Sequence, residues 1–151
     1  MRKQNVIIVG GGTAGWMCAA ALSKLIGNRL NITLVESEQI GTIGVGEATV
    51  PTFLTLHRLL KIDEADFLSK VQGTIKLGIS FENWRQIGHQ YIHSFGFTGQ
   101  GCWAAGFQHF WLKGKQLGLS EDYGDYTPEL KAAKENKFGF LKEAPLHYAY
   151  H

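Results

Sequence analysis

Residues 5–16 read NVIIVGGGTAGW, and this short stretch decides the fold of the chain. The continuous β-branched run within Asn5–Val9 is typical of a strand that is buried on both faces of a parallel sheet. Gly10, Gly12 and Gly15 fit the pattern GxGxxG, which joins a strand to a helix in dinucleotide-binding folds. The sequence therefore predicts a strand, a tight glycine turn and a helix in this order.

A helix and a second strand complete the predicted unit. Apolar residues recur every three or four positions over Ala14–Ile26, which predicts a helix, and Gly27 with Asn28 supplies a left-handed stop. Residues Asn31–Glu36 predict a second buried strand. The order indicates the α/β class, with a Rossmann-like βαβ unit. Such a domain needs more than two parallel strands, so we expect residues 1–151 to be the amino-terminal portion of a truncated, incomplete FAD/NAD(P)-binding domain.

The turn and the end of the second strand predict a site for the adenosine diphosphate part of a dinucleotide. Amide groups at the start of the helix, at Thr13 and Ala14, face the phosphates of such a ligand. Glu36 follows Gly15 by about 20 residues, where an acid accepts both ribose hydroxyls and disfavours a 2′-phosphate. We include the adjacent Ser37 in this site. The alternative is a glycine turn that only lets the helix pack closely on the strand.

Beyond this unit the sequence predicts short helices and an antiparallel pair of strands. The elements are helices at Thr52–Leu60, Glu64–Val71 with Asp63 as its cap, and Phe107–Leu112, and strands at Thr74–Phe81 and Tyr91–Phe97. Alternation in the first strand places Ile75, Leu77, Ile79 and Phe81 on one face and Lys76 on the other. Thr127 has the form of a helix cap and Pro128 that of the first helical residue, which predicts the start of a further helix.

Composition excludes several classes of function. The chain is 44% hydrophobic and 19% charged with a net charge of +2, so we expect neither nucleic acid nor a membrane as a partner. The apolar run Val6–Val9 is too short to span a bilayer. Cys18 and Cys102 match neither a CxxC pair nor a disulfide framework, which favours a reducing, cytoplasmic setting. The histidines lack metal-ligand spacing, and we predict no metal site.

A second glycine-rich segment indicates a protein family. Residues 41–51 read GTIGVGEATVP and would by themselves indicate only a loop. Together with GGGTAGW at residues 10–16, this segment closely resembles the flavin-dependent tryptophan halogenases. The resemblance continues through QGTIKLGI, FENW, HSFG and YAYH, at residues 72–79, 81–84, 93–96 and 148–151. It therefore spans nearly the whole chain.

The resemblance implies a cofactor, a reaction and several site residues. FAD would lie on the glycine turn, with Val45, Gly46, Glu47 and Ala48 in a strap along the flavin. A separate flavin reductase would supply the reduced FAD. The implied reaction passes through a flavin hydroperoxide, which oxidises chloride or bromide to hypohalous acid. Lys76 would be the essential lysine, holding this oxidant by hydrogen bonding or as a haloamine for attack on tryptophan or another electron-rich aromatic.

His93 and Phe95 occupy the place of an aromatic pair that stacks on the substrate in this family. A flat aromatic wall favours a flat aromatic substrate. The residues alone leave other interpretations open: Lys76 as a solvated lysine on an open sheet face, and the aromatic pair as ordinary core packing.

Two alternatives to a halogenase also stay open, a flavin monooxygenase of related fold and a non-catalytic gene remnant. We expect that the chain alone neither halogenates nor holds FAD tightly. The sequence does not indicate the aromatic substrate, its ring position, the preferred halide or the oligomeric state.

Overall fold

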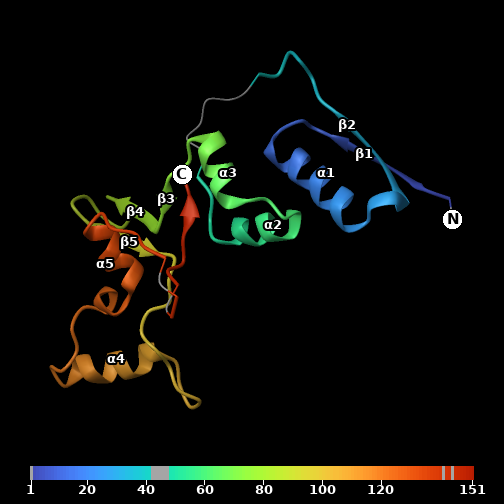
Figure 1. Cartoon of the computed structure of the whole chain (residues 1–151). Helices are drawn as coiled ribbons and strands as arrows, with labels where there is room; N and C mark the ends of the chain where they lie inside the picture. Colours follow the sequence, from blue (N-terminus) through green and yellow to red (C-terminus); the bar gives the residue numbers. More distant parts are fainter. Residues whose placement is uncertain (1, 42–47, 141, 144) are drawn as a thin grey trace. The chain divides into compact units, whose positions relative to one another are not determined.

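The chain forms two compact units, which are described separately below (Figure 1). The computed structural model describes residues 2–41, 48–140, 142–143 and 145–151. The first unit comprises residues 1–47 and 52–72, and the second comprises residues 48–51 and 73–151.

The first unit is built on the predicted βαβ arrangement. β1 (Gln4–Val9) and β2 (Leu30–Val35) pair in parallel, and α1 (Thr13–Leu25) with the short 3-10 helix η1 (Gly27–Arg29) connects them (Figure 1). Gly27 adopts a positive φ of 54°, as expected for the residue that ends this helix. The α/β class and the Rossmann-like unit predicted from the sequence are confirmed.

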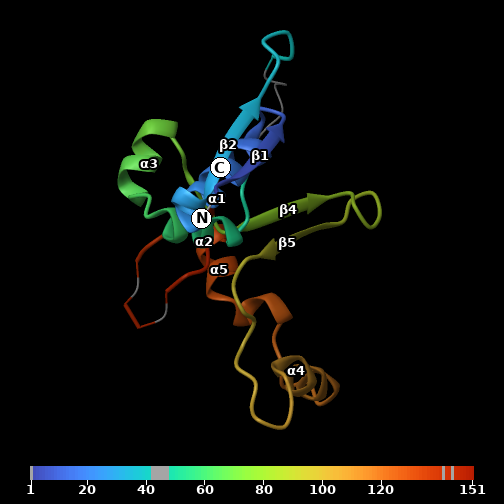
Figure 2. The same cartoon turned by 90° about the vertical axis from the view of Figure 1, so that its right-hand side faces the viewer.

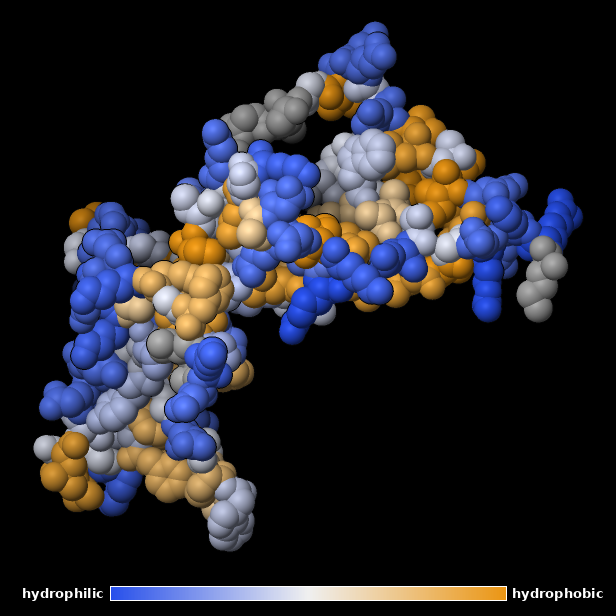
Figure 3. All heavy atoms as spheres, viewed as in Figure 1, coloured by the Kyte–Doolittle hydropathy of each residue, from blue (hydrophilic) through white to orange (hydrophobic). Residues whose placement is uncertain are grey.

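The prediction that both strands are buried on both faces was wrong. Burial alternates along β1 and β2, and Ile7 and Val9 are 69% and 84% exposed. α1 packs against the sheet, and within the described residues the outward face of the two strands has no comparable cover. A β-branched run of this kind is suited to a sheet covered on both sides. Apolar surface accordingly lies over this unit (Figure 3).

Two short helices complete the first unit with the predicted bounds. α2 spans Thr52–Leu60 and α3 spans Glu64–Val71. The Asp63 side chain accepts a hydrogen bond of 2.8 Å from the backbone N–H of Asp66, which caps α3 as predicted.

The imidazole of His57 is buried between these two helices. Its ring centroid lies 4.6 Å from that of Phe53 and 4.3 Å from that of Phe67, and only 4% of the residue is exposed. Burial lowers the pKa of His57 below 6.5 because a charged imidazolium is poorly solvated there. The nearby Glu64 carboxylate opposes this shift of the His57 pKa.

The second unit contains the remaining strands and helices. β4 (Gly78–Glu82) and β5 (Gln90–Ser94) form an antiparallel hairpin, as predicted (Figure 2). β3 (Ile75–Lys76) instead pairs antiparallel with β6 (Ala149–Tyr150) near the carboxyl end. The prediction of one continuous strand over Thr74–Phe81 was therefore wrong. Its first part is hydrogen-bonded to a partner distant in sequence, which local periodicity does not reveal.

The second unit also contains α4 (Phe107–Gln116), the 3-10 helix η2 (Tyr123–Tyr126) and α5 (Pro128–Lys134). Of these, α5 packs beside β4 and β5. Thr127 precedes α5 as predicted, but its hydroxyl is hydrogen-bonded to the Thr98 hydroxyl at 2.9 Å and does not cap the helix. Among the residues described here, no helix is long and apolar enough to cross a membrane.

Buried residues of the second unit gather around β6. Ala149 and Tyr150 are 0% and 3% exposed, and the Glu129 carboxylate is also buried. One Glu129 oxygen accepts the backbone N–H of His147 at 2.8 Å and lies 3.1 Å from Nδ1 of the same residue. Glu129 thus fixes the segment that leads into β6.

We expect the free energy of unfolding to fall as the pH is lowered below 6.5. Since the folded-state pKa of His57 is lowered, the unfolded chain binds the proton first, and stability is lost from pH 6.5 down to the folded-state pKa. One such group changes stability by at most about 1.4 kcal/mol per pH unit. Urea unfolding at pH 5 to 8, followed by circular dichroism, measures this dependence.

Two variants separate His57 from the other histidines. His57→Phe should reduce the pH dependence. Glu64→Gln should steepen it, because the opposing carboxylate charge is removed. An unchanged dependence in His57→Phe would contradict the assignment.

Candidate functional site

The glycine turn is constrained by its own backbone. Gly10 has a φ of 118°, and its N–H donates to the Val35 carbonyl at 2.8 Å, which joins the ends of the two strands. A Cβ at Gly15 would collide with the Gly10 carbonyl oxygen. The helix can lie this close to the turn only because Gly15 has no side chain. The first and third glycines thus have the geometry expected of a dinucleotide turn.

The start of α1 leaves its polar end open. Gly12 is the N-cap residue, no side chain caps the helix, and a Cβ at Gly12 would meet no atom within 4 Å. The N–H groups of Thr13 and Ala14 belong to the first helical turn, where no intrahelical acceptor exists. An open helix N-terminus with free amides fits a phosphate group.

Glu36 and Ser37 lie directly after β2. The Glu36 carboxylate occupies the space above Gly11, where any Cβ would overlap it. This position holds the acid beside the glycine turn, which fits the role of a ribose acceptor. The Ser37 hydroxyl accepts the N–H of Gln39 at 3.3 Å and so takes part in a local turn. Together with the open helix end, these groups fit the adenosine diphosphate half of FAD.

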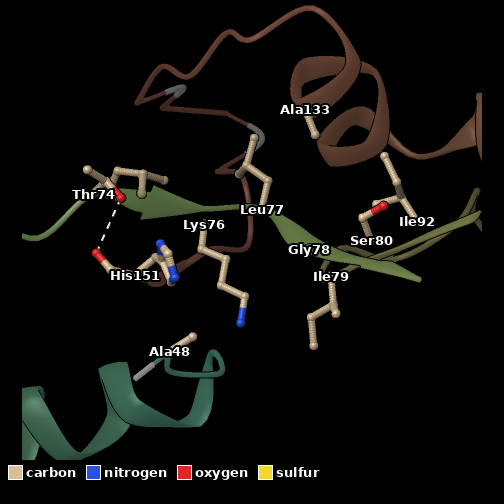
Figure 4. A pocket seen from close by; sticks show the side chains of 11 residues that line it. Ala48, Thr74, Lys76, Leu77, Gly78, Ile79, Ser80, Ile92, Ala133 and His151 are labelled. Atoms are coloured by element: carbon tan, nitrogen blue, oxygen red, sulfur yellow. Dashed lines mark hydrogen bonds between the residues drawn. The ribbon is translucent and has the colours of Figure 1, made fainter. Parts of the chain in front are cut away.

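The predicted strap is only partly visible. Val45, Gly46 and Glu47 lie outside the described residues. Ala48 is described, belongs to the second unit and lines the pocket that contains Lys76 (Figure 4).

Lys76 points into a pocket of about 440 Å³ in the second unit (Figure 4). Its Nζ donates to the backbone carbonyl of Thr49 at 3.3 Å and lies 5.5 Å from the centroid of the Phe95 ring. Lys76 is therefore only partly exposed, and its ammonium has two partners. A carbonyl and an aromatic face both stabilise an ammonium group, so the side chain is held in place.

The side chains around Lys76 do not follow the predicted alternation. In Figure 4, Lys76 and Ile79 extend toward the side of Ala48, whereas Leu77 extends to the other side, toward Ala133. The sequence predicted Ile79 on the face of Leu77. The difference arises at Leu77, which lies between β3 and β4 and accepts the Phe95 N–H at 2.9 Å.

The two residues of the predicted aromatic pair, His93 and Phe95, make different contacts. Phe95 lies beside the Lys76 ammonium, as described above. His93 is exposed and pairs with Ile79 across the hairpin, and neither His93 nor Phe95 is among the residues that line the pocket. Among the described residues, no group of three or more His, Cys, Asp or Glu side chains is placed to hold a metal ion.

Sequence reasoning missed two residues of this site, Thr49 and Tyr150. The Thr49 backbone carries the contact to Lys76, and Thr49 is itself hydrogen-bonded to Tyr150. A backbone carbonyl has no signature in the sequence. The alternation of Tyr148, Ala149 and Tyr150 was the one available sign of a strand at the carboxyl end.

The family of tryptophan halogenases has a sequence model that matches residues 5–151. The chain belongs to this family. It is 58% identical to Xcc4156, a flavin-dependent halogenase from Xanthomonas campestris, with a TM-score of 0.89 over 100% of this chain. BrvH, a flavin-dependent halogenase from Brevundimonas sp. BAL3, is 38% identical with a TM-score of 0.83 over 99% of the chain.

Among curated relatives, the 7-chloro-L-tryptophan 6-halogenase KtzR of Kutzneria sp. (strain 744) is 52% identical over 90 residues. These residues are 60% of this chain and 17% of KtzR. The chain spans 31% of the length of each of the two halogenase structures. The activity of a whole halogenase is therefore a proposal for this protein.

We expect Gly15→Ala to destabilise the first unit by about 1–3 kcal/mol, because the added methyl group collides with the Gly10 carbonyl. Gly12→Ser is the matched control. Its site is open, its φ of −75° suits any residue, and serine is a favourable N-cap residue. The free energies of unfolding of both variants are measured in urea. Equal stabilities would show that the close approach at Gly15 is not rigid.

Proposed function

We propose that this chain supplies the flavin-binding turn and the reactive-site lysine of an enzyme that halogenates an electron-rich aromatic, tryptophan or another indole. The observation that supports this most directly is the Lys76 ammonium, held in a pocket beside Phe95 in a chain of the tryptophan halogenase family. The turn and the lysine belong to different units of the chain.

FAD is the cofactor that we propose for the turn. Gly10, Gly12 and Gly15 would shape the backbone around the pyrophosphate, the amides of Thr13 and Ala14 would donate to it, and Glu36 would accept the ribose hydroxyls. Ser37 would belong to the same site. The strap residues Val45, Gly46, Glu47 and Ala48 would contact the flavin. When bound and reduced by a separate reductase, FAD supplies the electrons with which dioxygen oxidises chloride or bromide.

Lys76 would act on the oxidised halogen. An ammonium group has three N–H donors, and the Thr49 carbonyl accepts one of them. The others remain for hydrogen bonding to hypohalous acid, and the positive charge would polarise the halogen toward the aromatic substrate. A haloamine on Nζ is the alternative form of the same role. Both forms require a position near the substrate and protection from bulk water.

Phe95 would form part of the substrate wall. Its ring already lies close to the Lys76 ammonium, so an indole stacked on it would be placed near the halogen. His93 is the weaker part of the predicted pair, because it is exposed, whereas Phe95 is half-buried beside the Lys76 ammonium.

Replacing Lys76 in a chimera tests the proposal. Residues 1–151 would replace the matching third of the Xanthomonas campestris halogenase, to which they are 58% identical. With reduced FAD, oxygen, bromide and indole we expect a brominated product, and in Lys76→Met roughly 10²–10³-fold less of it, because a group that stabilises the transition state is lost.

The controls for this chimera are Lys131→Met, at an exposed lysine on α5, and flavin binding, which Lys76→Met should leave unchanged. Product masses with and without bromide identify the reaction. A hydroxylated product in both cases would favour a flavin monooxygenase, and full bromination by Lys76→Met would remove Lys76 from the chemistry.

The chain alone should form no halogenated product under the same conditions. Ile7 and Val9 are exposed on the outward face of β1, so the nucleotide-binding sheet lacks cover on one side among the described residues. We also expect FAD to bind weakly, with less than half-saturation at micromolar concentration in equilibrium dialysis. A halogenated product from residues 1–151 by mass spectrometry would contradict this expectation.

A further inference from the structure

The edge of β6 determines where Lys76 is held. In the antiparallel β3–β6 pair, Thr74 and His151 exchange two backbone hydrogen bonds of 2.8 and 2.9 Å. Consecutive residues of a strand direct their backbone groups to opposite edges. Tyr150, next to His151, therefore turns its N–H and its carbonyl away from β3. Tyr150 is 3% exposed, and such buried backbone groups need partners.

Thr49 supplies both of these partners. Its N–H donates to the Tyr150 carbonyl at 2.9 Å, and its hydroxyl oxygen accepts the Tyr150 N–H at 2.8 Å. The same hydroxyl donates to the Tyr150 carbonyl at 3.1 Å. A single threonine thus completes the edge of β6, as a neighbouring strand would. Valine has nearly the same shape as threonine but lacks the hydroxyl that makes two of these contacts.

The carbonyl of Thr49 is then turned toward Lys76. It accepts the Lys76 Nζ at 3.3 Å (Figure 4 shows the extended lysine). A lysine side chain is long and flexible, and its position is defined only where its ammonium has a fixed partner. The second contact, with the Phe95 ring at 5.5 Å, is a weaker constraint.

We propose that Thr49 is the positioning residue of Lys76: its hydroxyl fastens residues 48–51 to Tyr150, and its carbonyl holds the ammonium. The value of this position for catalysis rests on the proposed halogenase function. The hydrogen bonds themselves belong to this chain in the absence of any flavin, halide or substrate, so they are tested separately from catalysis.

Competitive lysine labelling measures the hold on the ammonium. Acetic anhydride at limiting concentration acetylates each lysine at a rate that mass spectrometry resolves residue by residue. In the wild-type chain we expect Lys76 to react more slowly than the exposed Lys24 and Lys131. In Thr49→Val the rate at Lys76 should rise roughly threefold to tenfold, the change expected when a hydrogen bond of ordinary net strength is lost.

Thr49→Ser is the matched control, because serine keeps the hydroxyl and should leave the rate at Lys76 within about twofold of wild type. Lys24 and Lys131 should be unaffected in both variants. Equal rates at Lys76 in wild type, Thr49→Ser and Thr49→Val would overturn the proposal. A parallel rise at all three lysines in Thr49→Val would also overturn it, since that result indicates general loosening.

If circular dichroism shows that Thr49→Val does not fold, the wild-type chain still provides a test, by comparing its native and urea-unfolded states. Protection of Lys76 relative to Lys24 and Lys131 should disappear in concentrated urea, and a native Lys76 without protection would refute the proposal. The outcome is independent of halogenation. An inactive chimera with a protected Lys76 would count against the proposed function and leave the role of Thr49 in place.

Discussion

The backbone pairing of β6 with β3 is the constraint on which the lysine site depends. Without it, Lys76 would belong to a two-residue strand with no fixed neighbour, because β4 turns away to pair with β5. The pairing brings the carboxyl end of the chain to Lys76, and Glu129 fixes the approach through its contacts with His147. Unpaired backbone groups are costly when they are buried, so the far edge of β6 needs a hydrogen-bonding partner. Thr49 is that partner.

The nucleotide turn follows from a steric constraint of a different kind. The strand, the glycines and the helix are contiguous in sequence, and the Gly10 N–H bond to the Val35 carbonyl joins them to the second strand. Gly10 requires a backbone conformation that a side chain disfavours, and Gly15 requires the absence of a side chain. A larger residue at Gly15 would push the helix away from the turn.

This contrast explains what could be predicted from the sequence. The βαβ unit, the bounds of α2 and α3 and the Asp63 cap depend on residues within one turn or one periodic segment, and they were predicted correctly. The continuous strand over Thr74–Phe81 and the capping role of the Thr127 hydroxyl were wrong, because His151 pairs with the backbone of Thr74 and Thr98 pairs with the Thr127 hydroxyl. Lys76 was found through its resemblance to a family, whereas its partner Thr49 acts through a carbonyl that every residue possesses.

The choice of a carbonyl as the partner of Lys76 has a chemical consequence. A carboxylate in that place would form an ion pair and offset the charge of the ammonium, but within the described part of the chain no carboxylate forms an ion pair with Lys76. A neutral carbonyl and the face of Phe95 fix the position of the ammonium and leave its net charge in place. In the proposed reaction this charge polarises the halogen, so a partner that positions the lysine without neutralising it serves the chemistry better than a salt bridge would.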